Sequence, residues 1–275
     1  MIEKIVKMLP SQIKGGMRGK LRYQTFFEKL HHISLVGMNF AEGTSIAKSG
    51  ETHLIKYLKS KYETNVGTHF IVFDVGANAG EYTLAILNHF GSNAHIFAFE
   101  PAKATFEILT KNIEAKNNVE LYNFGFGDTN NNLTLFYDTS GSTIASLYST
   151  TLDYYDWTTN IKNKKTEEIV IRKLDDFCCE KNINHIHFLK IDVEGHELNV
   201  LEGARKMIDS DAIDFIQFEF GQANVHSRTY FRDFFNLLDR KYNLYRIVQD
   251  GLHPIKRYRD SYEIFRTTNY FAERK

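Results

Sequence analysis

The stretch VFDVGANAGEYTLAI, residues 72–86, joins an apolar run to an amphipathic one through a turn of small residues. The run that ends in Asp74 is typical of a buried strand, and apolar side chains recur at helical spacing from Glu81 onward. Between them, Gly76 and Gly80 let the backbone bend sharply and let a ligand approach it closely. The stretch therefore predicts a strand, a tight turn and a helix that hold a small molecule.

Strand-like and helix-like runs alternate through the rest of the chain. The expected strands cover 70–74, 95–99, 119–124, 186–191, 213–219 and 243–248. The expected helices cover 81–90, 102–116, 196–208 and 229–240. This alternation predicts an α/β fold with a mostly parallel sheet covered on both faces.

Two segments depart from the alternation. Residues 129–168 are rich in Asn, Thr, Ser and Tyr, so we expect a long loop over one end of the sheet, with possible strands at 133–137 and 169–173. Residues 249–260 are too few for a crossover helix and read as a turn. The runs on either side, 243–248 and 262–272, are therefore expected to pair antiparallel.

The composition limits the classes of partner and the compartment. Acidic and basic residues number 34 each, so no global field selects nucleic acid. The adjacent cysteines Cys178 and Cys179 cannot easily form an ordinary disulfide and make a poor zinc site, which indicates a reducing compartment. No apolar run approaches the roughly 20 residues of a membrane span. We expect a cytoplasmic protein, with the inner face of the membrane as an alternative location.

The N-terminal part of the chain is basic. Seven Lys and Arg residues precede residue 31, against Glu3 and Glu28, and apolar residues recur among them at helical spacing. A helix packed on the domain with a solvated basic face and a peripheral membrane helix are both compatible with this pattern. We expect a helical extension over 1–60, packed on one globular domain over 61–275.

The acids near the glycine turn indicate which ligand it holds. A dinucleotide fingerprint would need glycine at positions 76, 78 and 81, where the chain has Gly76, Asn78 and Glu81. Glu81 would also repel a pyrophosphate at the helix start. Glu100 ends the next strand, where an acid commonly accepts both ribose hydroxyls. A nucleoside that carries a cation and no phosphate points to S-adenosylmethionine.

Longer motifs support this interpretation. IVFDVGANAGEYTL, FAFEPAKATFEILTKNI, GFGD, LDDF, FLKIDVEGHELNVLEGA and FIQFEFG occur in the order and at the spacing of the FkbM-family methyltransferases, which the chain resembles from about residue 37 onward. The resemblance implies a Rossmann-like class I methyltransferase fold. It also implies S-adenosylmethionine-dependent O-methylation, often of sugars in surface polysaccharides or glycolipids and sometimes of natural products.

The resemblance also implies roles for individual residues. It places the methionine end of the cofactor over Asp74, Gly76, Asn78 and Gly80, the ribose on Glu100 and the adenine amino group on Asp128. Glu51 is a candidate for the cofactor's α-amino group.

The strand end at KIDVEGHE supplies candidates for removing the acceptor's proton. His196 is the first choice, because an imidazole is readily neutral near pH 7, and Asp192 is either the second choice or a group that orients the cofactor or the base. Glu194 is the third ionisable group at this strand end. Candidates for contact with the acceptor follow the next strand, at Glu219, His226 and Arg228.

Two alternatives remain open. Asp192, Glu219 and Asn224 could form an oxygen-rich Mg²⁺ site, although the preferred interpretation has no metal. A non-catalytic cofactor-binding scaffold is the alternative to an enzyme. We expect a glycan or glycolipid acceptor and no nucleic-acid partner.

Overall fold

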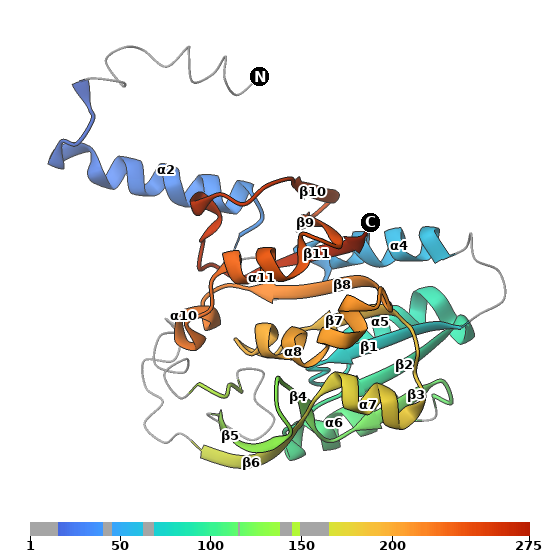
Figure 1. Ribbon diagram of the computed structural model, residues 1–275. Helices are drawn as coiled ribbons and strands as arrows, with labels where there is room; N and C mark the ends of the chain where they lie inside the picture. The colour runs from blue at the N-terminus through green and yellow to red at the C-terminus, as the bar shows by residue number, and fades with distance from the viewer. Residues whose placement is uncertain (1–15, 41–45, 63–68, 115, 138–144, 149–164) are drawn as a thin grey trace.

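The computed structural model of this chain describes residues 16–40, 46–62, 69–114, 116–137, 145–148 and 165–275. A large sheet lies between two layers of helices, and a small sheet closes one end of the molecule (Figure 1). The strands of the large sheet are, in spatial order, β3 (Val119–Tyr122), β2 (Ala94–Phe99), β1 (Phe70–Val75), β7 (Ile186–Ile191), β8 (Ile213–Phe220), β11 (Thr268–Arg274), β9 (Tyr242–Val248) and β10 (Gly251–Ile255).

The helices connect and cover these strands. They are η2 (Leu21–Tyr23), α2 (Gln24–Gly37), α3 (Ile46–Ser49), α4 (Glu51–Tyr62), α5 (Glu81–Phe90), η3 (Gly91–Asn93), α6 (Lys103–Ile113), α7 (Leu174–Lys181), α8 (Glu197–Gly203), α9 (Arg205–Asp209), α10 (Ala223–Ser227), α11 (Phe231–Leu238) and η5 (Asp260–Tyr262). The six expected strands of the alternating region are all present, within two residues of their predicted ends.

The sheet is parallel from β3 to β8 and antiparallel beyond it. β11 lies between β8 and β9 and runs antiparallel to both, which confirms the predicted antiparallel pair. The interpretation of 249–260 as a turn was wrong in part, because β10 forms there and pairs antiparallel with β9 at the edge of the sheet. Pro254 is compatible with this position, since an edge strand leaves one row of its backbone groups unpaired.

The strands alternate their side chains between two cores. Phe73 and Val75 pack with α7, α8 and α11 on one face, whereas Phe70 and Val72 pack with α4 and α5 on the other. The predicted helix 196–208 is divided into α8 and α9. The division follows Gly203, where a Cβ would lie 2.0 Å from the Gly127 carbonyl oxygen, so α8 is pressed against that loop.

A second sheet forms from the polar region. β4 (Gly125–Phe126) pairs parallel with β6 (Lys165–Arg172), and β5 (Asn131–Tyr137) pairs antiparallel with it, which confirms the possible strands in this region. The rest of the predicted loop, apart from 145–148, lies outside the described residues. The small sheet stands beside the carboxyl ends of the parallel strands, where its apolar side chains can form one wall of a site.

The N-terminal helices differ in how they contact the domain. Leu54, Ile55 and Leu58 of α4 are fully buried in the core against β1, so the predicted boundary at residue 60 falls inside a core helix. In contrast, α2 projects from the body of the molecule (Figure 1). The basic segment 1–15 lies outside the described residues. In the part of the chain that the structure describes, no helix is long and apolar enough to cross a membrane.

Candidate active site

The glycine turn is held against the neighbouring strand ends. Gly76 has φ +76°, its N–H donates to the Phe99 carbonyl (3.0 Å), and a Cβ there would lie 1.8 Å from the Asp192 carbonyl oxygen. Gly80 begins α5 with φ +90°, in a conformation that an L side chain rarely adopts. The turn therefore brings bare backbone to the carboxyl edge of β1 and β7.

Glu100 is bound to this turn through both of its oxygens. Oε2 accepts from the Asn78 N–H (3.1 Å) and Oε1 accepts from the Ala102 N–H (2.9 Å). The side chain is buried, and this burial raises the pKa of Glu100 to about 7, although the two backbone hydrogen bonds act in the opposite direction. Each oxygen keeps a lone pair, so the carboxylate can still accept from a diol in the pocket.

A buried lysine that the sequence interpretation missed organises the next strand end. Lys190 Nζ lies 3.2 Å from Asp74 Oδ1 and 3.6 Å from Asp192 Oδ2, and it donates to the Gly76 carbonyl (3.0 Å). Asp74 is fully buried and also accepts from Thr83 Oγ1 (2.7 Å). Asp74 thus supports the turn from beneath. A charged residue inside the otherwise apolar strand IHFLKI was the available signal for Lys190.

Glu51 lies in a buried network behind the turn. Its two oxygens accept from Ser49 Oγ (2.7 Å) and Gln217 Nε2 (2.6 Å), while Tyr82 donates its hydroxyl to Gln217 Oε1 (2.6 Å). Burial raises the pKa of Glu51 above its ordinary value. The network fixes α4 and α5 against β8 and leaves Glu51 outside the pocket wall.

The turn after β7 is held by Glu197, which sequence reasoning also missed. Its Oε1 accepts from the N–H groups of Val193 (3.1 Å) and Gly195 (3.0 Å), and burial raises the pKa of this carboxyl to about 7. Glu194 has φ +52°, and Ser146 Oγ donates to its carbonyl (2.9 Å). Side chains from α8 and from residues 145–148 therefore fix the backbone of 192–196.

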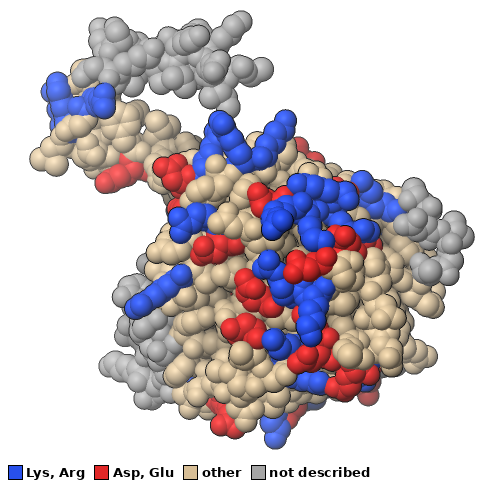
Figure 2. Space-filling model, viewed as in Figure 1, with Lys and Arg blue, Asp and Glu red and all other residues tan. Residues whose placement is uncertain are grey.

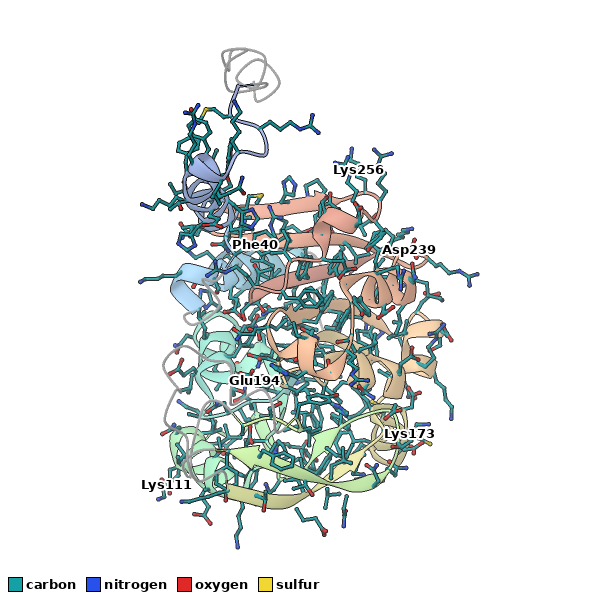
Figure 3. All side chains as sticks on the ribbon, turned by 90° about the vertical axis from the view of Figure 1, so that its left-hand side faces the viewer. Phe40, Lys111, Lys173, Glu194, Asp239 and Lys256 are labelled. Atoms are coloured by element: carbon teal, nitrogen blue, oxygen red, sulfur yellow. The ribbon has the colours of Figure 1, made fainter. Side chains whose placement is uncertain are left out.

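Three carboxylates meet beside this turn. One ligating oxygen each from Asp192, Glu194 and Glu219 lies within 4.8 Å of the others. Burial raises the pKa of Glu219 well above its ordinary value, and the charges of Asp192 and Glu194 add to the effect. Figure 3 shows Glu194 at the centre of the face onto which the strand ends open. This trio can take up a proton from a neighbouring hydroxyl.

Asn224, the third member of the alternative Mg²⁺ set, takes part in hydrogen bonds of the loop after β8. Asn224 Oδ1 accepts from the Gly221 N–H (2.8 Å), and its Nδ2 donates to Thr229 Oγ1 (2.9 Å), so this amide holds the loop after β8. Its Oδ1 keeps a lone pair, so the Mg²⁺ site of Asp192, Glu219 and Asn224 stays a prediction. Glu194 lies beside the two carboxylates of that set.

His196 is enclosed by its neighbours. Its side chain is 7% exposed, Nδ1 lies 3.3 Å from the Tyr148 hydroxyl, and a Cβ at Gly127 would lie 2.8 Å from Nε2. Nε2 has no hydrogen-bond partner among the described residues. Burial lowers the pKa of His196 to about 4, against the opposing charge of Asp128, so the ring is neutral and weakly basic at pH 7.

These groups surround a pocket that is open to solvent. Six predicted site residues line it: Gly76, Asn78, Glu100, Asp192, Glu194 and His196. The opposite wall is apolar and comes from Pro101, Phe126, Leu135, Leu147, Ile169 and Ile171. Asp74, Gly80, Asp128, Glu219, His226 and Arg228 are outside the wall.

The sequence of this chain is similar to those of known methyltransferases. A family model described as the methyltransferase FkbM domain matches residues 74–247. Methyltransferase 1 of Beauveria bassiana is 32% identical over 49% of this chain and 57% of its own length. The hexuronic acid methyltransferase AglP of Haloferax volcanii is 26% identical over 58% of this chain and 59% of its own. The chain thus spans less than two thirds of the length of these relatives.

Solved structures similar to this chain are also methyltransferases. One from Agrobacterium tumefaciens, described as SAM-dependent, has a TM-score of 0.46 and 10% identity, over 85% of this chain and 64% of that one. A SAM-dependent O-methyltransferase from Thermotoga maritima has a TM-score of 0.39 and 11% identity, and the match covers 81% of this chain and 64% of that one.

Proposed function

This chain belongs to the FkbM methyltransferase family, and we propose that it transfers the methyl group of S-adenosylmethionine to a sugar hydroxyl of a glycan or glycolipid. The observation that carries the proposal is the pairing of Glu100 with the glycine turn across one pocket. O-methylation of a small natural product is the second candidate, because one wall of the pocket is apolar.

The cofactor's adenosine portion fits the pocket lined by Glu100 and the small sheet. Glu100 would accept from the ribose hydroxyls, and the apolar wall of Phe126, Leu135 and Ile171 would hold the adenine. Gly76, whose carbonyl accepts from Lys190, would hold the methionine end. The bound cofactor supplies an electrophilic methyl group, and the chain aligns the acceptor oxygen with it.

Cofactor affinity is expected to fall as pH falls, because the ribose binds the ionised form of a carboxyl whose pKa is raised to about 7. From this pKa, binding should be about tenfold weaker at about pH 6 than at about pH 8. Calorimetric titration with S-adenosylmethionine across this range measures the effect. The Glu100→Gln variant should bind the cofactor weakly and with little pH dependence. This control is needed because the pKa of Glu197 is also raised to about 7, so Glu197 could cause a similar pH dependence. An affinity of the parent protein that does not change with pH would contradict the assignment of Glu100 to the ribose.

We propose that the carboxylate trio takes up the acceptor's proton, with Glu219 as the final proton acceptor behind the pocket-lining Asp192 and Glu194, and that Asp192 also orients the reacting groups. Burial and the charges of Asp192 and Glu194 raise the pKa of Glu219, so this carboxyl holds a proton more readily than an ordinary glutamate, whereas burial lowers the pKa of His196 to about 4. Asp192 lies 3.6 Å from Lys190 on the cofactor side and close to Glu194 and Glu219 on the other side. The assignment of His196 as the base stays a prediction, and mutation of Glu219 and of His196 can distinguish the two assignments.

Glu219→Gln is expected to lower kcat by about 10²–10⁴-fold while leaving the Kd for S-adenosylmethionine nearly unchanged, because only proton removal is lost. His196→Gln should lower kcat by less than about tenfold. Transfer of a labelled methyl group to an acceptor, with a parallel cofactor titration, measures both. The reverse order of effects would identify His196 as the base.

The acceptor is proposed to be a neutral sugar. Asp192 and Glu194 line the pocket, whose wall holds no Lys or Arg among the described residues, so a carboxylate on the acceptor would be repelled. AglP acts, by its name, on a hexuronic acid, which makes uronates the informative comparison. The test is methyl transfer from labelled S-adenosylmethionine to matched neutral and uronic-acid glycans. Transfer to neither, despite cofactor binding, would favour the natural-product candidate or a scaffold.

A further inference from the structure

We propose that α2 and its basic N-terminal flank dock this protein on an anionic lipid surface. The proposal begins with exposed apolar side chains. Of the ten large hydrophobic residues exposed in the described part of the chain, six lie between residues 21 and 38. They are Leu21, Phe26, Leu30, Ile33, Val36 and Met38, with Leu21 90% and Ile33 66% exposed. Such a concentration on one short segment marks an interaction surface.

The exposed residues form one stripe along the helix. Phe26, Leu30 and Ile33 are spaced i, i+4 and i+7, so they lie on one side of α2. Leu35, which is 4% exposed, points from another side and packs against the domain. The fourteen residues of α2 span about 21 Å, which allows the helix to lie in an interface and not to cross it.

The charges on this helix complement an anionic surface. Arg18, Lys20 and Arg22 are exposed at its start, and Figure 2 shows basic side chains gathered at the tip of the projecting arm. Lys29 borders the stripe, whereas Glu28 is the single acid between residues 16 and 37 and lies on the opposite side from Phe26. Basic residues beside an apolar helix face are the pattern that binds anionic lipid, where long basic side chains reach the headgroups.

A second copy of the chain is a poorer occupant of this stripe. Lys29 lies near the middle of α2, so two antiparallel copies related by a two-fold axis would place their Lys29 ammonium groups close together. Like charges at such a contact oppose pairing. On a lipid surface, the same lysine meets phosphate groups instead.

The base of α2 is anchored, so its direction is set by the domain. Asn39 Nδ2 donates to the carbonyls of Ser49 (2.8 Å) and Ile247 (3.2 Å), and Thr268 Oγ1 donates to the Asn39 carbonyl (2.9 Å). Figure 3 shows α2 at the upper edge of the same face on which Glu194 lies. Docking through α2 would therefore bring the opening of the active site towards the lipid. The docking itself does not depend on the proposed methyl transfer.

The test is flotation of the full-length protein with lipid vesicles. Vesicles of phosphatidylcholine with about 30% phosphatidylglycerol should bind the protein at least about tenfold more tightly than phosphatidylcholine alone, and about 0.5 M salt should weaken the binding. Leu30→Gln/Ile33→Gln and Lys20→Gln/Arg22→Gln should each lower the affinity at least about tenfold. Ile108→Gln, which alters an exposed hydrophobic residue on α6, is the matched control and should bind as the parent does.

Each other outcome would overturn the proposal. These are absence of vesicle binding by the parent, equal binding to both kinds of vesicle, and unchanged binding of the Leu30→Gln/Ile33→Gln variant. A parent dimer that this variant converts to a monomer, without vesicle binding, would assign the stripe to a second copy. Cofactor titration of every variant verifies that the domain is folded, since α2 contributes no residue to the pocket wall.

Discussion

Asp74→Asn is expected to destabilise the protein and to lower its affinity for S-adenosylmethionine at least about hundredfold. The substitution leaves the Lys190 ammonium with Asp192 at 3.6 Å and without its nearer partner, in a site where Lys190 is 4% and Asp74 0% exposed. Breaking a buried ion pair by removing one partner costs about 3–5 kcal/mol. Urea unfolding gives the stability change, and calorimetric titration gives the affinity.

A double variant separates stability from cofactor binding. Asp74→Asn/Lys190→Met removes both charges, and replacing both partners of a buried pair is often nearly neutral for stability. The variant should therefore recover most of the free energy of unfolding. It should still bind the cofactor poorly, because the Lys190 contact to the Gly76 carbonyl and the negative charge beneath the turn are both lost. Parent-like binding by this variant would make the pair purely structural.

Gly76→Ala is expected to be as damaging, through backbone geometry instead of charge. A Cβ at this position would lie 1.8 Å from the Asp192 carbonyl oxygen, and φ is +76°. The turn would have to move away from β7, which should cost on the order of 4 kcal/mol and disrupt the wall that receives the cofactor. Thermal unfolding and cofactor titration measure the two effects.

Gly91→Ala is the matched control for this variant. Gly91 also has a positive φ (58°, with ψ −133°), but no atom lies within 4 Å of the position that a Cβ would take there, so only the conformational strain of about 1–3 kcal/mol applies. Cofactor affinity should be unchanged, because Gly91 follows α5 at the end distant from the turn. Equal losses in the two variants would mean that positive φ, and not contact with β7, makes Gly76 necessary.

The parallel strands could be predicted almost to the residue because they are buried on both faces. A run such as IHFLKI is mostly apolar because helices cover both sides of the sheet, and β7 covers 186–191 as expected. β10 was missed because an edge strand buries little, and its sequence GLHPI contains a proline and a histidine. The break after α8 was missed because Gly203 is required by contact with the distant Gly127, which no local pattern records.

In the candidate site as well, residues with local partners could be predicted, and residues that depend on distant partners could not. Glu100 could be placed because it ends a strand next to the turn, and its backbone partners are local to that edge. Lys190 was missed because its importance depends on Asp74, which is 116 positions earlier in the chain. His196 was chosen for its intrinsic pKa, whereas burial against Gly127 lowers that pKa to about 4.

By itself, the sequence determined which elements form, where the strand ends carry acids, and that the turn at Gly76 suits a nucleoside without a pyrophosphate. These properties follow from local spacing and from the burial of whole elements, both of which leave a periodic pattern in the chain. Only the tertiary structure decided that Asp192, Glu194 and Glu219 meet, that Lys190 links two strand ends, and that one face of α2 is left uncovered. Charge interactions and solvent exposure depend on distances through space between residues far apart in sequence, so these features became visible only in the folded chain.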